Sequence, residues 1–483
     1  MARTDPEAIA DLVLALWDRV EALEAKVASL EMNSRNSSKP PSSDKHNFAN
    51  RPKPKSRRKK TGRRPGGQTG HKGCTLERTD DPDRIVELNF GASERCPGCG
   101  SPLCGSPRGE SECERRQVVE YIPAHFEVVE YRAERIRCPG CGGTATKPFP
   151  DGVAAPVQYG PLFRAMVLYA NKYQLIPFAR LADFFEDTAG RRVSTGTLVS
   201  VVRAAGEKAA LAMGFVAGAV AQSPVAHFDE TGLKTIEGLH WLHVACTEFL
   251  TCYHLDRKRG WEGMENFGIL PDYRGRAIHD FLPAYLKAVR ADHGFCGAHL
   301  ERELTFMDEQ MDQEWAPEMI ALMMKAKKLR DRHDRAGPGS RKVIGPGTQA
   351  TIRKEYFGIL EKGYAANPEP ERPPGKRGRP KRGKVLSLLD RFKNHYWEIM
   401  AYFEFEGVPF DNNQAERDLR MEKQREKISG IFRSMNHAVA SVHLRGVLST
   451  ARKQNRGVLE SLKQLLAAPL KLGKSFADFA MGT

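Results

Sequence analysis

The sequence lacks the marks of a secreted or membrane-inserted chain. Met1 precedes an acidic, amphipathic stretch, whereas a secretory leader has a basic start and an apolar core. A long uncharged stretch runs from Ala209 to Phe228, but Pro224 and His227 interrupt its second half. We therefore interpret it as the end of a buried helix that leads into a strand, and we expect a protein that stays inside the cell without membrane contact.

Two segments lack acidic residues. Residues 51–72 hold ten Lys or Arg, and residues 372–384 hold seven, with no Asp or Glu in either. Large apolar residues are also scarce in 33–65, a composition that builds no core, so we predict a basic disordered linker there. With a net charge of +15, these runs indicate a polyanionic partner, although charge alone does not separate DNA from RNA or an anionic membrane.

The chain of 483 residues exceeds what one hydrophobic core supports, so several modules are expected. The first is a predicted parallel coiled-coil dimer, because valine recurs at one heptad position and leucine or isoleucine at the other. A single amphipathic helix packed on its own chain is the alternative. The heptad positions are Ile9, Leu16, Leu23 and Leu30 on one side of the seam and Val13, Val20 and Val27 on the other.

Ten cysteines in a chain kept in a reducing compartment are not expected to form disulfides. Two Cys-Pro-Gly-Cys-Gly turns instead predict a closed four-thiolate zinc site with a structural or DNA-docking role. The ligands are Cys96, Cys99, Cys138 and Cys141. The 38 residues between the turns exceed the usual zinc ribbon, and they include Cys104 and Cys113, which remain alternative ligands. Alternation at 116–133 predicts hairpins there.

The middle of the chain changes from helices to strands. Apolar spacing from Tyr159 to Met213 predicts three short helices that resemble a helix-turn-helix, with Ser194 in the N-cap cluster of the third. Strands are predicted at 224–229, 239–246, 251–256 and 275–280, followed by a helix at 281–289 and a short apolar piece at 295–298. This order is typical of a ribonuclease-H-like fold, in which three meandering strands are followed by a strand, a helix, a further strand and a further helix.

Acids at the ends of two of these strands are the candidate chemical groups. In such a fold Asp229, on the first strand, and Asp280, at the end of the fourth, lie side by side. Adjacent carboxylates repel unless divalent cations neutralise them, and two such cations activate the attacking oxygen and stabilise the leaving oxygen of a phosphodiester. A third carboxylate is needed, and Glu416 offers one near the start of a long basic helix.

Motifs along nearly the whole chain resemble the insertion sequence 66 family of bacterial DDE transposases. The matching segments are Asn36–Asp44, Arg64–Gly73, the cysteine turns, Tyr159–Gly160, Ser194–Leu198, Asp229–Thr231, Cys296–Arg302, Asn412–Arg417 and Lys427–Arg433. The resemblance implies a catalytic triad of Asp229, Asp280 and Glu416 holding magnesium or manganese, and Asp280 is identified by the run His279–Tyr285. Many relatives have Asp-Gly-Tyr where this chain has Asp280, Phe281 and Leu282, which leaves Asp292 as a competitor.

The candidate acids also have structural interpretations. Asp229 could cap a turn before Thr231, and Glu416 follows Asn413 at the spacing of a capping box. Glu422 and Glu426 are expected to be solvated surface acids of the basic helix. Cys296 and His299 have the spacing of metal ligands, but an isolated pair of this kind is more often part of a core.

The fold expected is a multidomain α/β protein with a ribonuclease-H-like, retroviral-integrase-like core. In chain order we expect a coiled coil (1–32), a basic linker (33–65), a zinc-binding ribbon-like domain (66–150), a helix-turn-helix-like domain (155–215), the first part of the catalytic core (222–300), a helical insertion with a basic loop (301–394), the second part of the core (395–450) and a helical tail (451–483). Within the insertion, 317–333 is predicted to be helical and 337–384 to be a mobile, DNA-facing loop.

Double-stranded DNA is the expected partner, bound through backbone contacts. The residues expected to contact it are Arg57, Arg58, Lys59, Lys60, Arg63, Arg64, Arg417, Arg420, Lys427 and Arg433, with Lys423 and Arg425 as further candidates. The resemblance implies a DNA transposase that cleaves and transfers strands at the ends of a mobile element in the bacterial cytoplasm, with accessory proteins from the same element. A zinc-containing DNA-binding regulator without nuclease activity is the alternative, and an RNA-processing nuclease is a third hypothesis.

Overall fold

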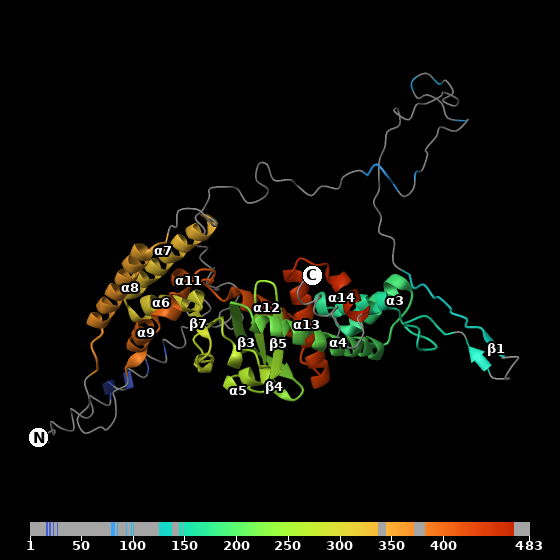
Figure 1. Ribbon diagram of the computed structural model, residues 1–483, viewed down its shortest axis with the longest axis horizontal. Coiled ribbons are helices and arrows are strands. Elements are labelled where there is room, and N and C mark those ends of the chain that lie inside the picture. The colour runs from blue at the N-terminus through green and yellow to red at the C-terminus, as the bar shows by residue number, and fades with distance from the viewer. Residues whose placement is uncertain are drawn as a thin grey trace, which may run out of the picture. The chain divides into compact units, whose positions relative to one another are not determined.

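The computed structural model describes residues 148–336, 344–370 and 382–467 continuously, together with 125–137, 144–146 and scattered positions closer to the N-terminus. The chain divides into two units, residues 53–126 and the remainder. The helices and strands labelled in Figure 1 belong to the remainder. Several predicted sites lie outside the described residues, namely the linker, Cys96, Cys99, Cys138 and Cys141, and the basic side chains Arg57, Arg58, Lys59, Lys60, Arg63 and Arg64.

A five-stranded mixed sheet forms the centre of this unit, with the strand order β5-β4-β3-β6-β7. Its strands are β3 (Val225–Thr235), β4 (Gly238–Cys246), β5 (Thr251–Asp256), β6 (Arg276–His279) and β7 (Asp292–Phe295). The first three form an antiparallel meander, while β6 runs parallel to β3 and β7 runs parallel to β6. This arrangement is consistent with the expected ribonuclease-H-like core.

Strand β3 is longer than the sequence pattern predicts. The predicted strand stops at Asp229, but β3 continues to Thr235 because every residue from His227 onward pairs with β4. A turn at Ile236 and Glu237 joins the two strands, and Gly238 after it has a φ of +104°, which favours glycine. Asp229 therefore lies within a strand and does not cap a turn before Thr231.

Three helices cover the meander: α4 (Thr195–Ala221), α12 (Asn413–Ser429) and α13 (Met435–Lys453). Leu233, Leu242 and Val244 of the sheet pack against Ala415 and Leu419 of α12 and Val442 of α13. Figure 1 shows the green strands beside these helices. Since side chains alternate along β3, Asp229 shares the face of Leu233, the face that α12 covers.

Helix α4 is part of this core. By length and composition it could cross a membrane, but Val216 and Val220 are buried and the helix packs on α13 and β5, as expected of a buried helix that leads into a strand. The helices before it are α2 (Pro161–Leu168), the π-helical turn η4 (Tyr169–Tyr173) and α3 (Phe178–Ala189). The prediction of three short helices is thus wrong for the third, although Ser194 does cap it by accepting from the Thr197 N–H.

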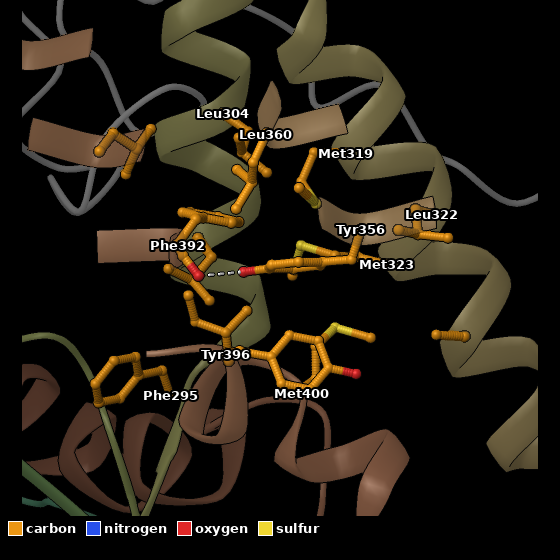
Figure 2. Packing of buried hydrophobic residues seen from close by; sticks show 14 of the residues in the cluster. Phe295, Leu304, Met319, Leu322, Met323, Tyr356, Leu360, Phe392, Tyr396 and Met400 are labelled. Atoms are coloured by element: carbon orange, nitrogen blue, oxygen red, sulfur yellow. Dashed lines mark hydrogen bonds between the residues drawn. The ribbon is translucent and has the colours of Figure 1, made fainter. Parts of the chain in front are cut away.

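A second hydrophobic core lies beside β7 and is built mainly by the helices that follow this strand. Its helices are α6 (Gly297–Met311), α7 (Trp315–Ala336), α8 (Pro346–Ala366), α9 (Gly383–Asn394), α10 (Tyr396–Ile399) and α11 (Ala401–Glu404). Figure 2 shows Tyr356 at the centre of this core, donating a hydrogen bond of 2.8 Å to the Phe392 carbonyl oxygen. The cluster includes Phe295 of β7, so the insertion and the sheet share one core.

Several predicted elements differ in the structure. Helix α8 occupies much of 337–384, which was predicted to be a loop. Residues 281–289 form turns and the short 3-10 segment η6 (Tyr285–Lys287) in place of a helix. Residues 125–133 form no strand, and the short hairpin of β1 (Arg135–Arg137) and β2 (Thr144–Thr146) lies farther along. From residue 125 onward, the remaining elements of the part of the chain that the structure describes are α5 (Trp261–Phe267), η5 (Leu270–Asp272) and α14 (Val458–Ala467).

Candidate active site

Strand register brings two of the predicted acids together. In the parallel pair β3 and β6, Val225 lies opposite Arg276 and His227 lies opposite Ile278. Asp229 lies two residues after His227 and Asp280 lies two residues after Ile278, so the two acids reach the same level along neighbouring strands.

The third acid, Glu416, lies in the first turn of α12 and is held there by Asn412. The buried Asn412 side chain donates to the Phe228 carbonyl oxygen at 2.8 Å, and its oxygen lies 2.9 Å from His227 Nδ1. The Asn412 N–H donates to Cys296 Sγ at 3.2 Å. The Asn412 side chain thus ties the start of α12 to β3, just before Asp229, and the Asn412 backbone N–H ties it to the end of β7.

The pKa of Asp229 is affected by both of the other predicted acids, Asp280 and Glu416. Burial raises the pKa of Asp229 well above its ordinary value, and the nearby carboxylates of Glu230, Asp280 and Glu416 raise it further. The N–H of Glu230 donates to Asp229 at 2.8 Å and opposes this shift in part. Like charges from distant parts of the chain are therefore gathered around one side chain, and a cation placed among them would relieve their repulsion.

Asp280 is fixed by the turn that follows β6. One of its carboxylate oxygens accepts from the Leu282 N–H at 2.9 Å, and its carbonyl oxygen accepts from His279 Nδ1. The competitor Asp292 lies at the start of β7, where its exposed side chain pairs with Arg276 at 3.1 Å. Because Asp280 follows the end of β6 and Asp292 is level with its start, the geometry favours Asp280 as the partner of Asp229.

Glu416 does not act as a helix cap. The N-cap of α12 is Asn412, which makes no side-chain capping bond, so the capping-box interpretation is wrong. The Oε1 atom of Glu416 is buried and has no hydrogen-bond partner among the described residues. It lies 3.9 Å from His299 Nδ1, which also has no hydrogen-bond partner among these residues. Glu416 is thus available to bind a ligand.

A further buried group beside the acids, Glu230, was not predicted from the sequence. Glu230 is almost fully buried, accepts from Tyr285 Oη at 2.5 Å and pairs with Arg259 at 3.0 Å. Burial raises the pKa of Glu230, although the bonds from Tyr285 and Arg259 oppose the shift. Its position directly after Asp229 was the available signal, but only the fold shows that Tyr285 and Arg259 meet it.

The basic helix α12 presents only some of its cations to solvent. The candidates Arg417, Arg420, Lys427 and Arg433 are exposed on and just after it. By contrast, Arg425 is buried, pairs with Glu422 at 3.0 Å and lies 3.6 Å from the centre of the Phe432 ring. Lys423 donates to the Gly232 carbonyl oxygen. The interpretations of Arg425 as a DNA contact and of Glu422 as a solvated acid are therefore wrong.

A cavity of about 280 Å³ opens beside the acids. Asp280, Cys296 and His299 line it together with Phe281 and two arginines, Arg259 and Arg391. Carboxylate oxygens are the ligands that magnesium and manganese prefer, so the donor set of Asp229, Asp280 and Glu416 fits such ions.

Comparison with known families identifies the chain. A model described as the Transposase IS66 family matches residues 156–440, and one described as the zinc-finger binding domain of transposase IS66 matches residues 93–142, which contain both cysteine turns. A third model, for a family of unknown function, matches residues 3–77. No curated protein matches. Because the first match covers more than half of the chain and all three acids, the protein belongs to the IS66 family of DDE transposases.

Proposed function

We propose that this transposase cleaves and rejoins DNA strands at the ends of a mobile element, with Asp229, Asp280 and Glu416 as its catalytic metal ligands. The observation that carries the proposal is the matched level of Asp229 and Asp280 at neighbouring positions of the sheet, with Glu416 in the first turn of α12, whose start Asn412 ties to β3. The raised pKa of Asp229 supports it, because three like charges gathered at one place suit a divalent-cation site.

The protein side chains need to do little beyond binding and positioning. Two bound magnesium or manganese ions would activate the attacking oxygen and stabilise the leaving one. Asp229 lies within β3, Asp280 directly follows β6, and Asn412 ties the start of the helix of Glu416 to β3, so the carboxylates are held in place before substrate arrives. The exposed Arg417 and Arg420, on the helix of Glu416, are suited to bind the phosphates that flank the scissile bond.

The two reaction steps balance without a covalent protein intermediate. In the first, the oxygen of water forms a bond to phosphorus at the element end, and the bond from phosphorus to the 3′ oxygen breaks and leaves a 3′-hydroxyl. In the second, that hydroxyl attacks a target phosphodiester, and the target's own 3′ oxygen leaves. We further propose that Cys96, Cys99, Cys138 and Cys141 hold a structural zinc, and that the protein works in the bacterial cytoplasm.

The test compares acid variants on DNA that carries the element ends, which are found by searching the DNA that flanks the gene for short inverted repeats. Asp229→Asn, Asp280→Asn and Glu416→Gln should each reduce strand cleavage in Mg²⁺ by at least about 10²-fold, the loss typical when one electrostatic stabiliser is removed. DNA binding in a mobility-shift assay should persist. Asp292→Asn is the matched control, since its side chain is exposed and paired with Arg276, and it should cleave like the parent.

Three results would contradict the proposal. Full cleavage by Asp229→Asn would remove the triad from the chemistry. A parent protein that binds the repeats but never cuts them, with accessory proteins supplied, would favour the DNA-binding regulator, and preferential cleavage of RNA in a parallel reaction would favour the nuclease hypothesis.

A further inference from the structure

A sulfur, a nitrogen and an oxygen donor meet at the edge of the acidic triad. The Sγ atom of Cys296, a ring nitrogen of His299 and a carboxylate oxygen of Glu416 all lie within 4.8 Å of one another. Strand pairing places Cys296 directly after β7, where its N–H donates to the His279 carbonyl oxygen at 2.9 Å. His299 then lies in the first turn of α6, so both residues point from fixed backbone toward Glu416.

The polar atoms of this cluster are incompletely satisfied by the protein. His299 Nδ1 and Glu416 Oε1 are buried, lie 3.9 Å apart, and neither has a hydrogen-bond partner among the described residues. Leaving two buried polar atoms unpaired costs roughly 1–3 kcal/mol each. A cation between them would satisfy both atoms, and Cys296 and His299 line the cavity beside Asp280, which offers a route of entry.

The donor types select a zinc-like cation over magnesium. Thiolate and imidazole are ligands of Zn²⁺ and Co²⁺, whereas Mg²⁺ prefers oxygen. Three protein ligands also leave one tetrahedral position open. Burial raises the pKa of Cys296 to about 12, so binding must displace its proton, while the N–H groups of Asn412 and His299 point at the sulfur and favour the thiolate.

We propose that Cys296, His299 and Glu416 form a binding site for a zinc-class cation, and that its occupancy withdraws Glu416 from the acidic triad and inhibits the transposase. The second half rests on the proposed function, because it requires Glu416 to be a catalytic ligand. A Zn²⁺ ion held by Cys296 and His299 would draw the Glu416 carboxylate toward sulfur and nitrogen and neutralise its charge, so it would compete with magnesium for this carboxylate at the triad.

The binding test is a Co²⁺ titration of the full chain loaded with one Zn²⁺ per molecule for the proposed four-thiolate site, and it is monitored by the thiolate-to-cobalt charge-transfer absorption. The parent should show a saturable band that Cys296→Ser lacks, and Cys252→Ser, which changes another buried thiol, should keep it. Any exchange of Co²⁺ for Zn²⁺ at the other cysteines occurs equally in the parent and in the two cysteine variants, so it cancels in the comparison of their spectra. His299→Ala should weaken Co²⁺ binding by at least about tenfold, and because this side chain is partly exposed, the variant also covers the case in which Cys296→Ser fails to fold.

The inhibition test measures strand cleavage in Mg²⁺ with increasing Zn²⁺, each protein relative to its own rate without Zn²⁺. His299→Ala should require at least about tenfold more Zn²⁺ than the parent for half inhibition. Identical Co²⁺ titrations of the parent, Cys296→Ser and His299→Ala would overturn the site. If Co²⁺ binds at this site but the Zn²⁺ concentration for half inhibition is the same in the parent and in His299→Ala, the proposed competition for Glu416 is overturned. A parent without any cleavage would contradict the proposed function, and the Co²⁺ titration would still decide the site.

Discussion

Lys172 is a lysine enclosed by helices. It lies in the π-helical turn η4, is only 7% exposed, and its Nζ donates to Ser441 Oγ at 2.6 Å. Burial lowers the pKa of Lys172 to about 7, although the charge of Glu422 opposes the shift. A group that is charged in the unfolded chain and partly neutral in the folded one makes stability depend on pH.

Stability should therefore rise with pH above neutrality. Between the folded pKa near 7 and the ordinary lysine pKa of 10.5, the unfolded state holds the extra proton, so the free energy of unfolding increases by up to about 1.4 kcal/mol per pH unit. Lys172→Met should remove this slope, whereas Lys234→Met, at an exposed position of β3, should keep it. Urea unfolding at pH 7, 8 and 9 measures the slopes, and equal slopes for Lys172→Met and the parent would refute the assignment.

Helices α4 and α13 cross at a glycine. A Cβ built at Gly206 would lie 2.3 Å from Ala440 Cβ and 2.7 Å from Ala440 Cα, and the latter belongs to the backbone and has no rotamer to change. Gly214, two turns farther along the same helix, has no atom of this kind within 4 Å. The close crossing holds α13 against α4 and β5 on the sheet face where α12 also packs.

The same substitution should thus have opposite effects at the two glycines. Gly214→Ala should stabilise the protein by roughly 0.5–1 kcal/mol, because alanine has the higher helix propensity. Gly206→Ala should destabilise it by about 1–3 kcal/mol, since the clash with Ala440 outweighs that gain. Thermal unfolding of both variants beside the parent is the measurement, and a stabilised Gly206→Ala would show that α4 and α13 pack less closely.

At the scale of the whole molecule, association through the N-terminal heptads remains a prediction. Leu16, Val20, Leu23 and Val27 are helical where described, and each is about half exposed. Exposed leucines and valines at heptad spacing are the surface that a second copy of the helix would cover.

The parent chain should be a dimer in size-exclusion chromatography with light scattering. Leu23→Asp puts a charge in the seam and should yield a monomer. Trp17→Asp changes a residue of the same predicted helix outside the seam positions and should leave the dimer intact. A parent that is monomeric at every accessible concentration would instead support a single helix packed on its own chain.

Local patterns predicted most elements, and the misses have physical reasons. Helix α8 carries a buried stripe of Ile352, Tyr356 and Leu360, but flanking glycine, proline and basic residues dominated the composition of 337–384. The segment after Asp280 forms turns because the Leu282 N–H bonds to Asp280 and only twelve residues separate β6 from β7. Strand β3 passes Asp229 because β4 supplies backbone partners, which no local pattern records.

By itself, the sequence determined the order of the strands and the family to which the chain belongs, and it predicted the three acids of the proposed site, because these reside in local periodicity and motif spacing. Only the tertiary structure decided that Cys296 and His299 reach Glu416, and that Glu422 and Arg425 of the basic helix are buried. These contacts join residues far apart in the chain or depend on which side of α12 faces the sheet. Strand register and core packing fix them, and neither is encoded in a short stretch of sequence.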